Sequence, residues 1–387
     1  MCAAAALAIA ACSPAQVSAP VALPTIGPAT GEPTPPAQLQ AASTIDADVY
    51  KPSRTLPACP VGSPLKTGDT HASLKDALMT AQTYHKETQG IGLMVLKDGA
   101  LIHSDFSDGM DGATQTVTAS MMKSVVGLMI GIAVEKGHIG SVDDPVRLYL
   151  PEWADDPRGD ITIKQTLTMS TGLTPIPLME FLFAPDMNKA ALTASLGNQP
   201  GSEFYYSNSV SQVLGTILDR QSKANGYDDF AEFLYRDLWC PLGNGEASLW
   251  TDIAGNTRAY AGLNAGMDDW ARIGELIRNQ GRANSVQIVP AGWIVEMTQS
   301  SDLNPRYGYH VWRAGGWKSK RAYNKDSPIG VPHSAPFAAQ DTVFFDGFGG
   351  QRVYIIPSKG LTIVRVGAIN LQYDDAIIPN VLAEAVK

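Results

Sequence analysis

The sequence predicts an α/β protein of the α+β type, in which both ends of the chain build one antiparallel sheet. Three observations support this fold class: β-type residues at 91–104, mostly helical patterns between about 160 and 300, and a return to β-type residues at 307–366. Because a sheet must bury its apolar faces, we expect flanking helices and a mainly helical lobe, about residues 140–300, inserted between the two halves of the sheet.

The folded domain, which we place at residues 70–387, is expected to begin with a helix and a hairpin. Apolar periodicity over residues 74–87 predicts the helix. The β-type segments 91–96 and 101–104 flank an Asp-Gly pair at 98–99, which is typical of a tight hairpin turn.

The later elements follow from the same two patterns. Apolar residues at helical spacing predict helices, and segments rich in Val, Ile, Phe and Tyr between turn residues predict strands. The expected helices are 209–220, 227–237, 267–279, 290–299 and 373–387, and the expected strands are 307–312, 341–346, 351–356 and 361–366.

Residues 1–12 form an alanine-rich apolar run that ends in Cys12. The run is too short to span a bilayer; it resembles the apolar core of a secretion signal, and its ending Ile-Ala-Ala-Cys resembles a bacterial lipobox. This predicts an exported protein of the periplasm or cell envelope, lipid-anchored through Cys12, although no Lys or Arg precedes Lys51. The alternative is a disordered apolar tail. Residues 13–69 are rich in Pro and Ala and predict an extended linker.

Composition and charge exclude several functions. The 387 residues carry a net charge of −9 without any basic block, so we expect no nucleic-acid partner and membrane contact only through the possible lipid anchor. The six histidines are scattered and metal-binding motifs are missing, so no metal and no cofactor is expected. Apart from Cys2 and Cys12, the chain has Cys59 and Cys240, which form either one disulfide in an oxidising compartment or two unrelated thiols.

The sequence Thr118 to Gly127 contains the first candidate for chemistry, a Ser-x-x-Lys spacing at the start of an apolar helix. Ser120 lies in or next to the first helical turn, where free N–H groups favour a developing anion. Lys123 follows one turn later on the same face, and a desolvated lysine can take the proton of a serine hydroxyl. The alternative, favoured by this spacing alone, is an ordinary helix cap.

Two further segments can contribute to the same chemistry. Tyr206, in the turn before a predicted helix, has a phenol that can act as a general acid or base, and Asn208 follows it. Residues 346–350 read Asp-Gly-Phe-Gly-Gly between two predicted strands, where glycines allow backbone N–H groups to approach a reacting oxygen. The alternatives are a surface aromatic turn and a glycine-rich turn without chemistry.

These three motifs, in this order, resemble those of the serine β-lactamase and penicillin-binding-protein superfamily. The resemblance is to its class C-like branch, which includes family VIII carboxylesterases and 6-aminohexanoate-dimer hydrolases. It covers about residues 70–387, and further similar stretches lie at 123–127, 137–145, 167–173 and 345–354. The resemblance implies a β-lactamase/transpeptidase-like fold.

The resemblance also implies roles for individual residues. Ser120 would attack an ester or amide carbonyl and become acylated. Lys123 and Tyr206 would carry its proton to the leaving group and then activate a water for deacylation. Asn208 would orient Lys123 or the substrate.

The glycine-rich strand edge has an implied role as well. The backbone N–H groups of Ser120 and Phe348 would form the oxyanion hole, with Gly347 and Gly349 on either side of Phe348. Removing one such donor typically costs about 10²–10³ in rate.

One departure from the superfamily pattern bears on the substrate. Where β-lactamases and transpeptidases have Lys-Thr-Gly, this chain has Phe-Asp-Gly at 345–347, or Phe-Gly-Gly at 348–350, and neither offers a cation for a β-lactam carboxylate. We therefore predict a serine hydrolase that cleaves a small-molecule ester or amide with a small or uncharged acyl group. The alternatives are a β-lactamase or D,D-peptidase, and a non-catalytic binding or sensor domain on the same scaffold.

Overall fold

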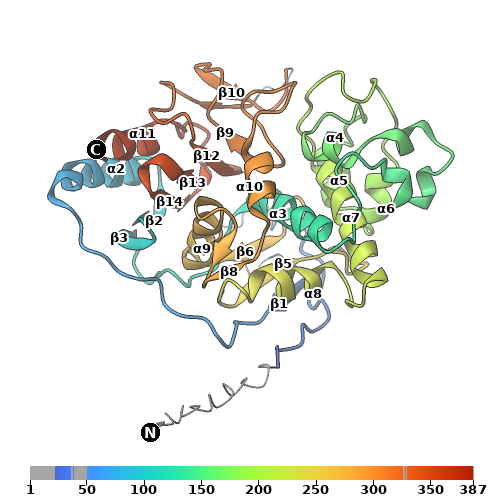
Figure 1. Ribbon diagram of the computed structural model, residues 1–387, viewed down its shortest axis with the longest axis horizontal. Coiled ribbons are helices and arrows are strands. Elements are labelled where there is room, and N and C mark those ends of the chain that lie inside the picture. The colour runs from blue at the N-terminus through green and yellow to red at the C-terminus, as the bar shows by residue number, and fades with distance from the viewer. Residues whose placement is uncertain (1–21, 36–37, 39–49, 326, 328, 387) are drawn as a thin grey trace, which may run out of the picture.

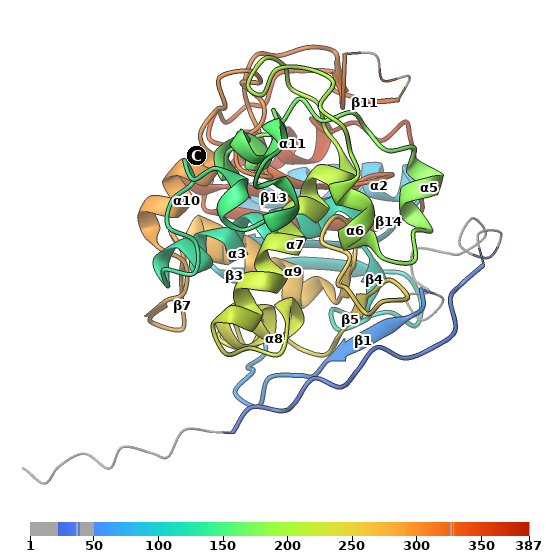
Figure 2. The same ribbon diagram turned by 90° about the vertical axis from the view of Figure 1, so that its right-hand side faces the viewer.

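A six-stranded antiparallel sheet, built from both ends of the chain, lies on the left in Figure 1, with the helical lobe on the right; in the turned view of Figure 2 the lobe is in front of the sheet. The computed structural model describes residues 22–35, 38, 50–325, 327 and 329–386. The strand order is β3-β2-β14-β13-β12-β9, so the N-terminal hairpin pairs with a C-terminal strand, as predicted. The strands are β2 (Gly90–Lys97), β3 (Ala100–Phe106), β9 (Trp312–Arg313), β12 (Val343–Gly347), β13 (Gln351–Ile356) and β14 (Leu361–Gly367).

Helices cover both faces of this sheet. On one face α2 (Lys75–Glu87) and α11 (Ile377–Ala385) lie side by side (Figure 1). On the other face α9 (Met267–Arg278) packs against β13 and β14. There Gly274 lies against the side chain of Thr362, because the absence of a Cβ lets the helix approach the strands closely.

The helix that follows Ser120 is α3 (Met122–Glu135), and its side chains are buried almost throughout. Because its residues are apolar on nearly all sides, this helix is stable when other elements surround it. It ends just before Gly137, which adopts a left-handed conformation with φ +71°. α3 packs against α7 (Asn208–Ala224) of the lobe. The 3₁₀ turn directly before α3, Ala119–Met121, contacts β12 and β13, so this segment joins the lobe to the sheet.

The lobe and the connections contain many short elements. The lobe helices besides α7 are α4 (Ile163–Leu167), α5 (Leu178–Leu182), α6 (Met187–Leu192) and α8 (Phe230–Leu234), and α8 continues into a π-helical turn at Tyr235–Trp239. Short 3₁₀ turns lie at Ala72–Leu74, Ala119–Met121, Val146–Leu148, Pro151–Trp153, Pro157–Asp160 and Pro357–Lys359. The other elements are α10 (Ala291–Thr298) and two small hairpins, β7 (Arg282–Ala283) with β8 (Val286–Gln287) and β10 (Lys320–Ala322) with β11 (Gly330–Pro332).

A second sheet shows that the folded part of the chain begins before residue 70. Its order is β1-β5-β6-β4, with β1 (Ser53–Leu56), β5 (Ala247–Trp250), β6 (Leu263–Ala265) and β4 (Thr116–Val117). Arg54 of β1 is also paired with Asp229 of the lobe. The linker predicted at 13–69 therefore contains a structural strand, which was missed because prolines on either side mask a segment of only four residues.

Two other predictions need correction. The lobe predicted at about 140–300 includes β5 and β6, and α9 packs on the main sheet rather than inside a helical lobe. The predicted strand at 307–312 is mostly a turn, since His310 has φ +56° and only Trp312 and Arg313 join the sheet. A residue in this conformation cannot continue an extended strand.

The N-terminal predictions remain largely open. Cys12 and the predicted signal at residues 1–12 lie outside the residues that the structure describes. Within the described ranges, no helix combines the length and the apolar character needed to cross a bilayer.

Cys59 and Cys240 form a disulfide that links the segment after β1 to the end of the lobe. The two residues are 181 positions apart, so the bond closes a long loop. We expect the Cys59→Ser/Cys240→Ser variant to lose about 2–4 kcal/mol of unfolding free energy, because the unfolded chain regains the freedom that the cross-link removes. Urea unfolding measures this loss, and the wild-type protein in excess dithiothreitol should match the variant. Equal midpoints for oxidised and reduced protein would contradict the prediction.

Candidate active site

Ser120 lies in a 3₁₀ turn, Ala119–Met121, directly before α3. Ala119 has φ +48°, a conformation that non-glycine residues adopt rarely and mostly where surrounding structure enforces it. The Ser120 side chain is only partly buried, so its hydroxyl remains accessible, whereas the following residues of α3 are buried. The chain therefore presents one accessible hydroxyl directly before a helix whose own first residues are buried.

Lys123 is 1% exposed, and its Nζ has three oxygen neighbours. Nζ lies 3.0 Å from Ser120 Oγ, 2.8 Å from Asn208 Oδ1 and 2.9 Å from the carbonyl oxygen of Tyr260. The last two oxygens can only accept hydrogen bonds, so they take two N–H donors of the amine. In the neutral amine the remaining lone pair is then directed to the Ser120 hydroxyl.

Burial favours that neutral form. It lowers the pKa of Lys123 from 10.5 to about 7, and the negative charge of Asp346 only partly opposes this shift. A large share of the amine is therefore unprotonated at neutral pH. This is the protonation state that a general base requires.

Tyr206 lies in the turn before α7, with its ring centroid 4.9 Å from Lys123 Nζ. Burial raises the pKa of Tyr206 well above 10, neighbouring acidic groups raise it further, and a side-chain hydrogen bond with Ser120 acts in the opposite direction. The phenol is thus protonated at neutral pH and can donate a proton. Its ring packs against those of Trp312 and Tyr323, at 5.8 and 5.3 Å, which hold it in place.

The glycine-rich motif forms the hairpin between β12 and β13 and reaches the Ser120 turn. Gly347 lies against the carbonyl oxygen of Thr118, so close that a Cβ at this position would collide with it. Gly349 adopts φ +78°, which turns the chain into β13. Phe348, between these glycines, is 39% exposed at the end of the strand. This strand edge therefore lies next to the turn that carries Ser120.

A buried ion cluster behind this strand was not predicted. Asp346 pairs with Arg321 and Arg352 at 2.7 and 2.8 Å, and both arginines also pair with Asp375. Burial alone would raise the pKa of Asp375, but the two guanidinium groups lower it below its usual range. The cluster fixes β12 against the C-terminal part of the chain. No local pattern indicates this cluster, because its members come from four separate segments.

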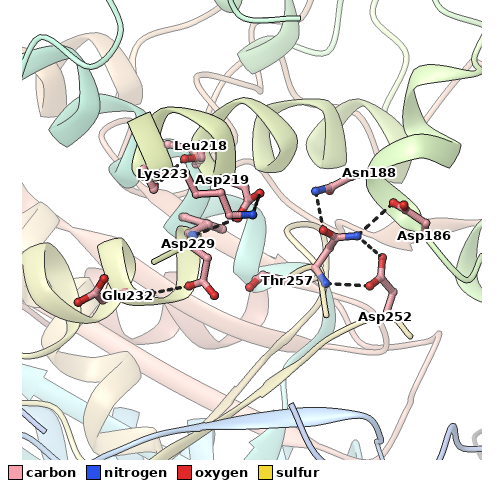
Figure 3. Close-up of polar contacts among 12 residues, drawn as sticks. Asp186, Asn188, Leu218, Asp219, Lys223, Asp229, Glu232, Asp252 and Thr257 are labelled. Carbon is pink, nitrogen blue, oxygen red and sulfur yellow. Dashed lines mark hydrogen bonds and ion pairs between the residues drawn. The ribbon is translucent and has the colours of Figure 1, made fainter. Parts of the chain in front are cut away.

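The Tyr260 carbonyl was also missed, and a hydrogen-bond network positions it. Gln212 of α7 is fully buried; its side chain donates to the Thr257 carbonyl at 2.9 Å and accepts from the Ala259 N–H at 3.0 Å. Asp186, Asn188 and Asp252 hold the same loop through Asn256 (Figure 3). The loop therefore presents its Tyr260 carbonyl to Lys123 in a fixed position.

The predicted site residues fall into two groups. Ser120, Lys123, Tyr206 and Asn208 meet around the Lys123 amine, and the hairpin with Gly347, Phe348 and Gly349 adjoins them through Thr118. Cys59 and Cys240 lie apart from this site, in the disulfide. In the part of the chain that the structure describes, no group of three or more His, Cys, Asp or Glu side chains is arranged to hold a metal ion.

Comparison with known proteins shows the family to which the chain belongs. The Beta-lactamase family matches residues 76–382, most of the chain, and the protein belongs to this family. Over 228 residues it is 23% identical to the 6-aminohexanoate-dimer hydrolase of Paenarthrobacter ureafaciens, an alignment that covers 54% of this chain and 57% of that relative. The chain thus matches little more than half the length of this curated relative.

Solved structures share the fold at low sequence identity. A protein of Bacillus anthracis, described as a candidate 6-aminohexanoate-dimer hydrolase, superposes with a TM-score of 0.68 at 18% identity over 88% of this chain and 91% of its own. A family VIII carboxylesterase superposes with a TM-score of 0.61 at 13% identity over 83% of this chain and 98% of its own. These likenesses confirm the β-lactamase/transpeptidase-like fold.

Proposed function

We propose that this protein is a serine hydrolase that cleaves esters or amides of small molecules through an acyl-enzyme on Ser120. The contact between Lys123 Nζ and Ser120 Oγ, at 3.0 Å within a buried amine site, carries the proposal. A surface helix cap would not need a buried lysine whose other two donors are occupied by fixed carbonyl oxygens.

The first step would be acylation. Ser120 Oγ attacks the substrate carbonyl carbon while its proton moves to the lone pair of Lys123 Nζ. The oxygen of the resulting tetrahedral intermediate carries the negative charge, and the backbone N–H groups of Ser120 and Phe348 are the proposed donors to it. The proximity of Gly347 to Thr118 supports this pairing of donors from two separate segments.

Tyr206 would act on the leaving group. Because its pKa is raised, the phenol keeps its proton at neutral pH and can give it to the departing alcohol or amine, whose anion is the stronger base; Lys123 can then return a proton to the phenol. In deacylation the same groups would work in reverse: a water loses a proton to the Lys123–Tyr206 pair and attacks the acyl carbon, and Ser120 Oγ leaves with a proton.

The strand beside the site supports ester or amide substrates over β-lactams. Asp346 takes the central position of the segment where β-lactamases have Lys-Thr-Gly, and it is buried and paired with two arginines. The neighbouring Phe345 side chain packs against Trp270, with ring centroids 6.3 Å apart. A substrate carboxylate would therefore find no lysine at this position.

A side-by-side assay tests the proposal. We expect hydrolysis of p-nitrophenyl esters or of the 6-aminohexanoate dimer, with little turnover of nitrocefin, and loss of that hydrolysis in Ser120→Ala. Nitrocefin as the best substrate would favour a β-lactamase instead. If none of the three substrate classes is turned over, a binding or sensor role on this scaffold becomes the better explanation.

The pH dependence of kcat/KM should report the Lys123 amine. Because its pKa is lowered to about 7, the base form is lost as the pH falls through 7. We expect kcat/KM for a neutral ester to be level above pH 7 and to fall about tenfold per pH unit well below it. A rate that stays constant between about pH 5 and 8, or that declines as the pH rises through 7, would contradict a lysine base.

We also propose that the protein is exported and anchored by a lipid on Cys12. The Cys59–Cys240 disulfide supports an oxidising compartment such as the periplasm. Metabolic labelling with radioactive palmitate in a bacterial host should label the wild type and not Cys12→Ser. Labelling of both proteins, or of neither, would argue against this anchor.

A further inference from the structure

Asn324 lies in the turn after β10 and binds the backbone of Tyr206. The Tyr206 N–H donates to Asn324 Oδ1 at 2.6 Å, and Asn324 Nδ2 donates to the Tyr206 carbonyl at 3.3 Å. The two residues are 118 positions apart in the sequence, and the Asn324 side chain is half-buried. One amide side chain therefore bonds both the donor and the acceptor of a single residue's backbone.

The segment that carries Asn324 is itself fixed in place. Three residues earlier, Arg321 is 1% exposed and pairs at 2.7 Å with each of the two aspartates of the buried ion cluster. The ring of Tyr323 lies between this arginine and the site, with its centroid 5.2 Å from the Arg321 Cζ and 5.3 Å from the Tyr206 ring. Asn324 thus extends from a segment that is tied to buried carboxylates.

The turn that contains Tyr206 is also bonded on its other side. The Tyr205 N–H donates to the Met169 carbonyl at 2.7 Å, and α7 begins two residues after Tyr206. Met169 of the lobe and Asn324 of the β10 segment therefore hold neighbouring peptide groups of the same turn.

The direction of the Tyr206 side chain depends on the two bonds to Asn324. The Tyr206 N–H and carbonyl belong to the planar peptide groups on either side of its Cα, so fixing both groups fixes the direction in which the Cβ leaves the backbone. The phenol oxygen is the side-chain atom farthest from the backbone, so a small backbone rotation moves this oxygen most. A displacement of about 1 Å at a reacting group can lower a rate about 10²-fold.

We propose that Asn324 is a positioning residue for the hydrolysis: its two hydrogen bonds fix the Tyr206 backbone, so that the phenol stays directed at the leaving group. This inference rests on the proposed function, because it requires Tyr206 to donate the proton that the leaving group takes up. The Asn324 amide transfers no proton itself and acts through Tyr206.

The dependence on the leaving group distinguishes this role from a general structural one. The variant is Asn324→Ala, and the substrates are ethyl butyrate and p-nitrophenyl butyrate, which form the same acyl-enzyme. A displaced phenol slows the departure of ethoxide, which needs a proton, and matters little for p-nitrophenolate. We expect kcat/KM to fall about tenfold or more for ethyl butyrate and to stay within about threefold for p-nitrophenyl butyrate. Chromatography of the released butyrate measures both rates.

A double-mutant cycle gives a second readout. In Tyr206→Phe the hydroxyl that Asn324 would position is absent. Adding Asn324→Ala to this variant should therefore change kcat/KM for ethyl butyrate by no more than about twofold, whereas independent losses would multiply.

Asn380→Ala is the matched control. Asn380, on α11, makes the same pair of bonds outside the site: its Oδ1 accepts from the Ala338 N–H and its Nδ2 donates to the Pro336 carbonyl, both at 2.8 Å. We expect kcat/KM of this control to stay within about twofold of wild type for both esters. Urea unfolding shows whether each variant is folded.

Asn324→Asp is the conservative variant, because it keeps an acceptor for the Tyr206 N–H. It should recover part of the ethyl butyrate rate that Asn324→Ala loses. If Asn324→Ala does not fold, the two esters and the Tyr206→Phe background are applied to Asn324→Asp instead, with a smaller loss of the same pattern expected.

The outcomes separate the two proposals. A loss that is larger for ethyl butyrate and that disappears in the Tyr206→Phe background supports Asn324 as a positioning residue. Equal losses for both esters, no loss, or a loss that persists in full in the Tyr206→Phe background would overturn the inference and leave the serine hydrolase intact. A wild type that cleaves neither butyrate and is inert toward the 6-aminohexanoate dimer would instead count against the proposed function.

Discussion

Replacing Lys123 by methionine is expected to lower kcat/KM by about 10³–10⁴-fold. Methionine has a similar length and fits an apolar surrounding, but it has no lone pair of comparable basicity for the Ser120 proton. The Ser120 hydroxyl would keep its place in the 3₁₀ turn and lose its partner at 3.0 Å. Steady-state hydrolysis of the best p-nitrophenyl ester measures the loss.

A folding control accompanies this prediction. Burial disfavours the charged amine, so removing the amine should relieve that cost, although the Asn208 and Tyr260 oxygens lose a donor. The variant should therefore stay folded, with a urea midpoint near that of the wild type. A folded Lys123→Met enzyme that retains more than about a tenth of the activity would rule out lysine as the base.

Replacing Tyr206 by phenylalanine is expected to lower kcat by about 10²–10³-fold. The ring keeps its packing against Trp312 and Tyr323, and only the hydroxyl that would donate to the leaving group is removed. The loss should be larger for substrates with poor leaving groups, such as amides and alkyl esters, than for p-nitrophenyl esters, whose leaving group needs little protonation.

Tyr307→Phe is the matched control for this change. The Tyr307 ring lies 6.1 Å from that of Tyr206 and is almost fully buried, and its hydroxyl has no hydrogen-bond partner among the described residues. We expect its kcat to stay within about threefold of wild type. Similar losses for Tyr206→Phe and Tyr307→Phe would show that the effect comes from packing rather than from proton transfer.

The predictable part of the site is the part encoded locally or by recurrent motifs. Ser120 and Lys123 lie one helical turn apart, so their contact follows from helix geometry once the apolar helix is recognised. Tyr206 and the hairpin around Phe348 were found because they follow in a characteristic order. The contact with the Tyr260 carbonyl could not be predicted, because any residue type supplies such a carbonyl and Tyr260 lies 137 positions from Lys123 in the sequence.

The ion cluster around Asp346 could not be predicted from the sequence either. Asp346 was visible in the strand motif, but its partners Arg321, Arg352 and Asp375 become neighbours only when β10, β13 and the segment before α11 assemble. No local spacing relates such residues. The sequence consequently indicated a missing cation at the strand, and only the structure reveals that two buried cations lie behind it and neutralise Asp346.

The fold was predictable where patterns are long and regular. The strands at 91–96, 351–356 and 361–366 and the helices at 74–87 and 267–279 were placed within a few residues, because each buries a continuous apolar face. Short strands were not predicted. β1, for example, has only four residues, and its pairing with β5 depends on tertiary contacts. The turn at His310 likewise depends on a left-handed backbone conformation, which a histidine in the sequence does not indicate.

Covalent labelling of Ser120 is the most direct test of the proposed acyl-enzyme mechanism. Wild-type protein is incubated with a fluorophosphonate, and the intact mass and the peptide that carries the adduct are measured. We expect a single adduct per chain on Ser120, no adduct on Ser120→Ala, and much slower labelling of Lys123→Met. An equally labelled Ser120→Ala protein, or an adduct on another residue of the wild type, would contradict this mechanism.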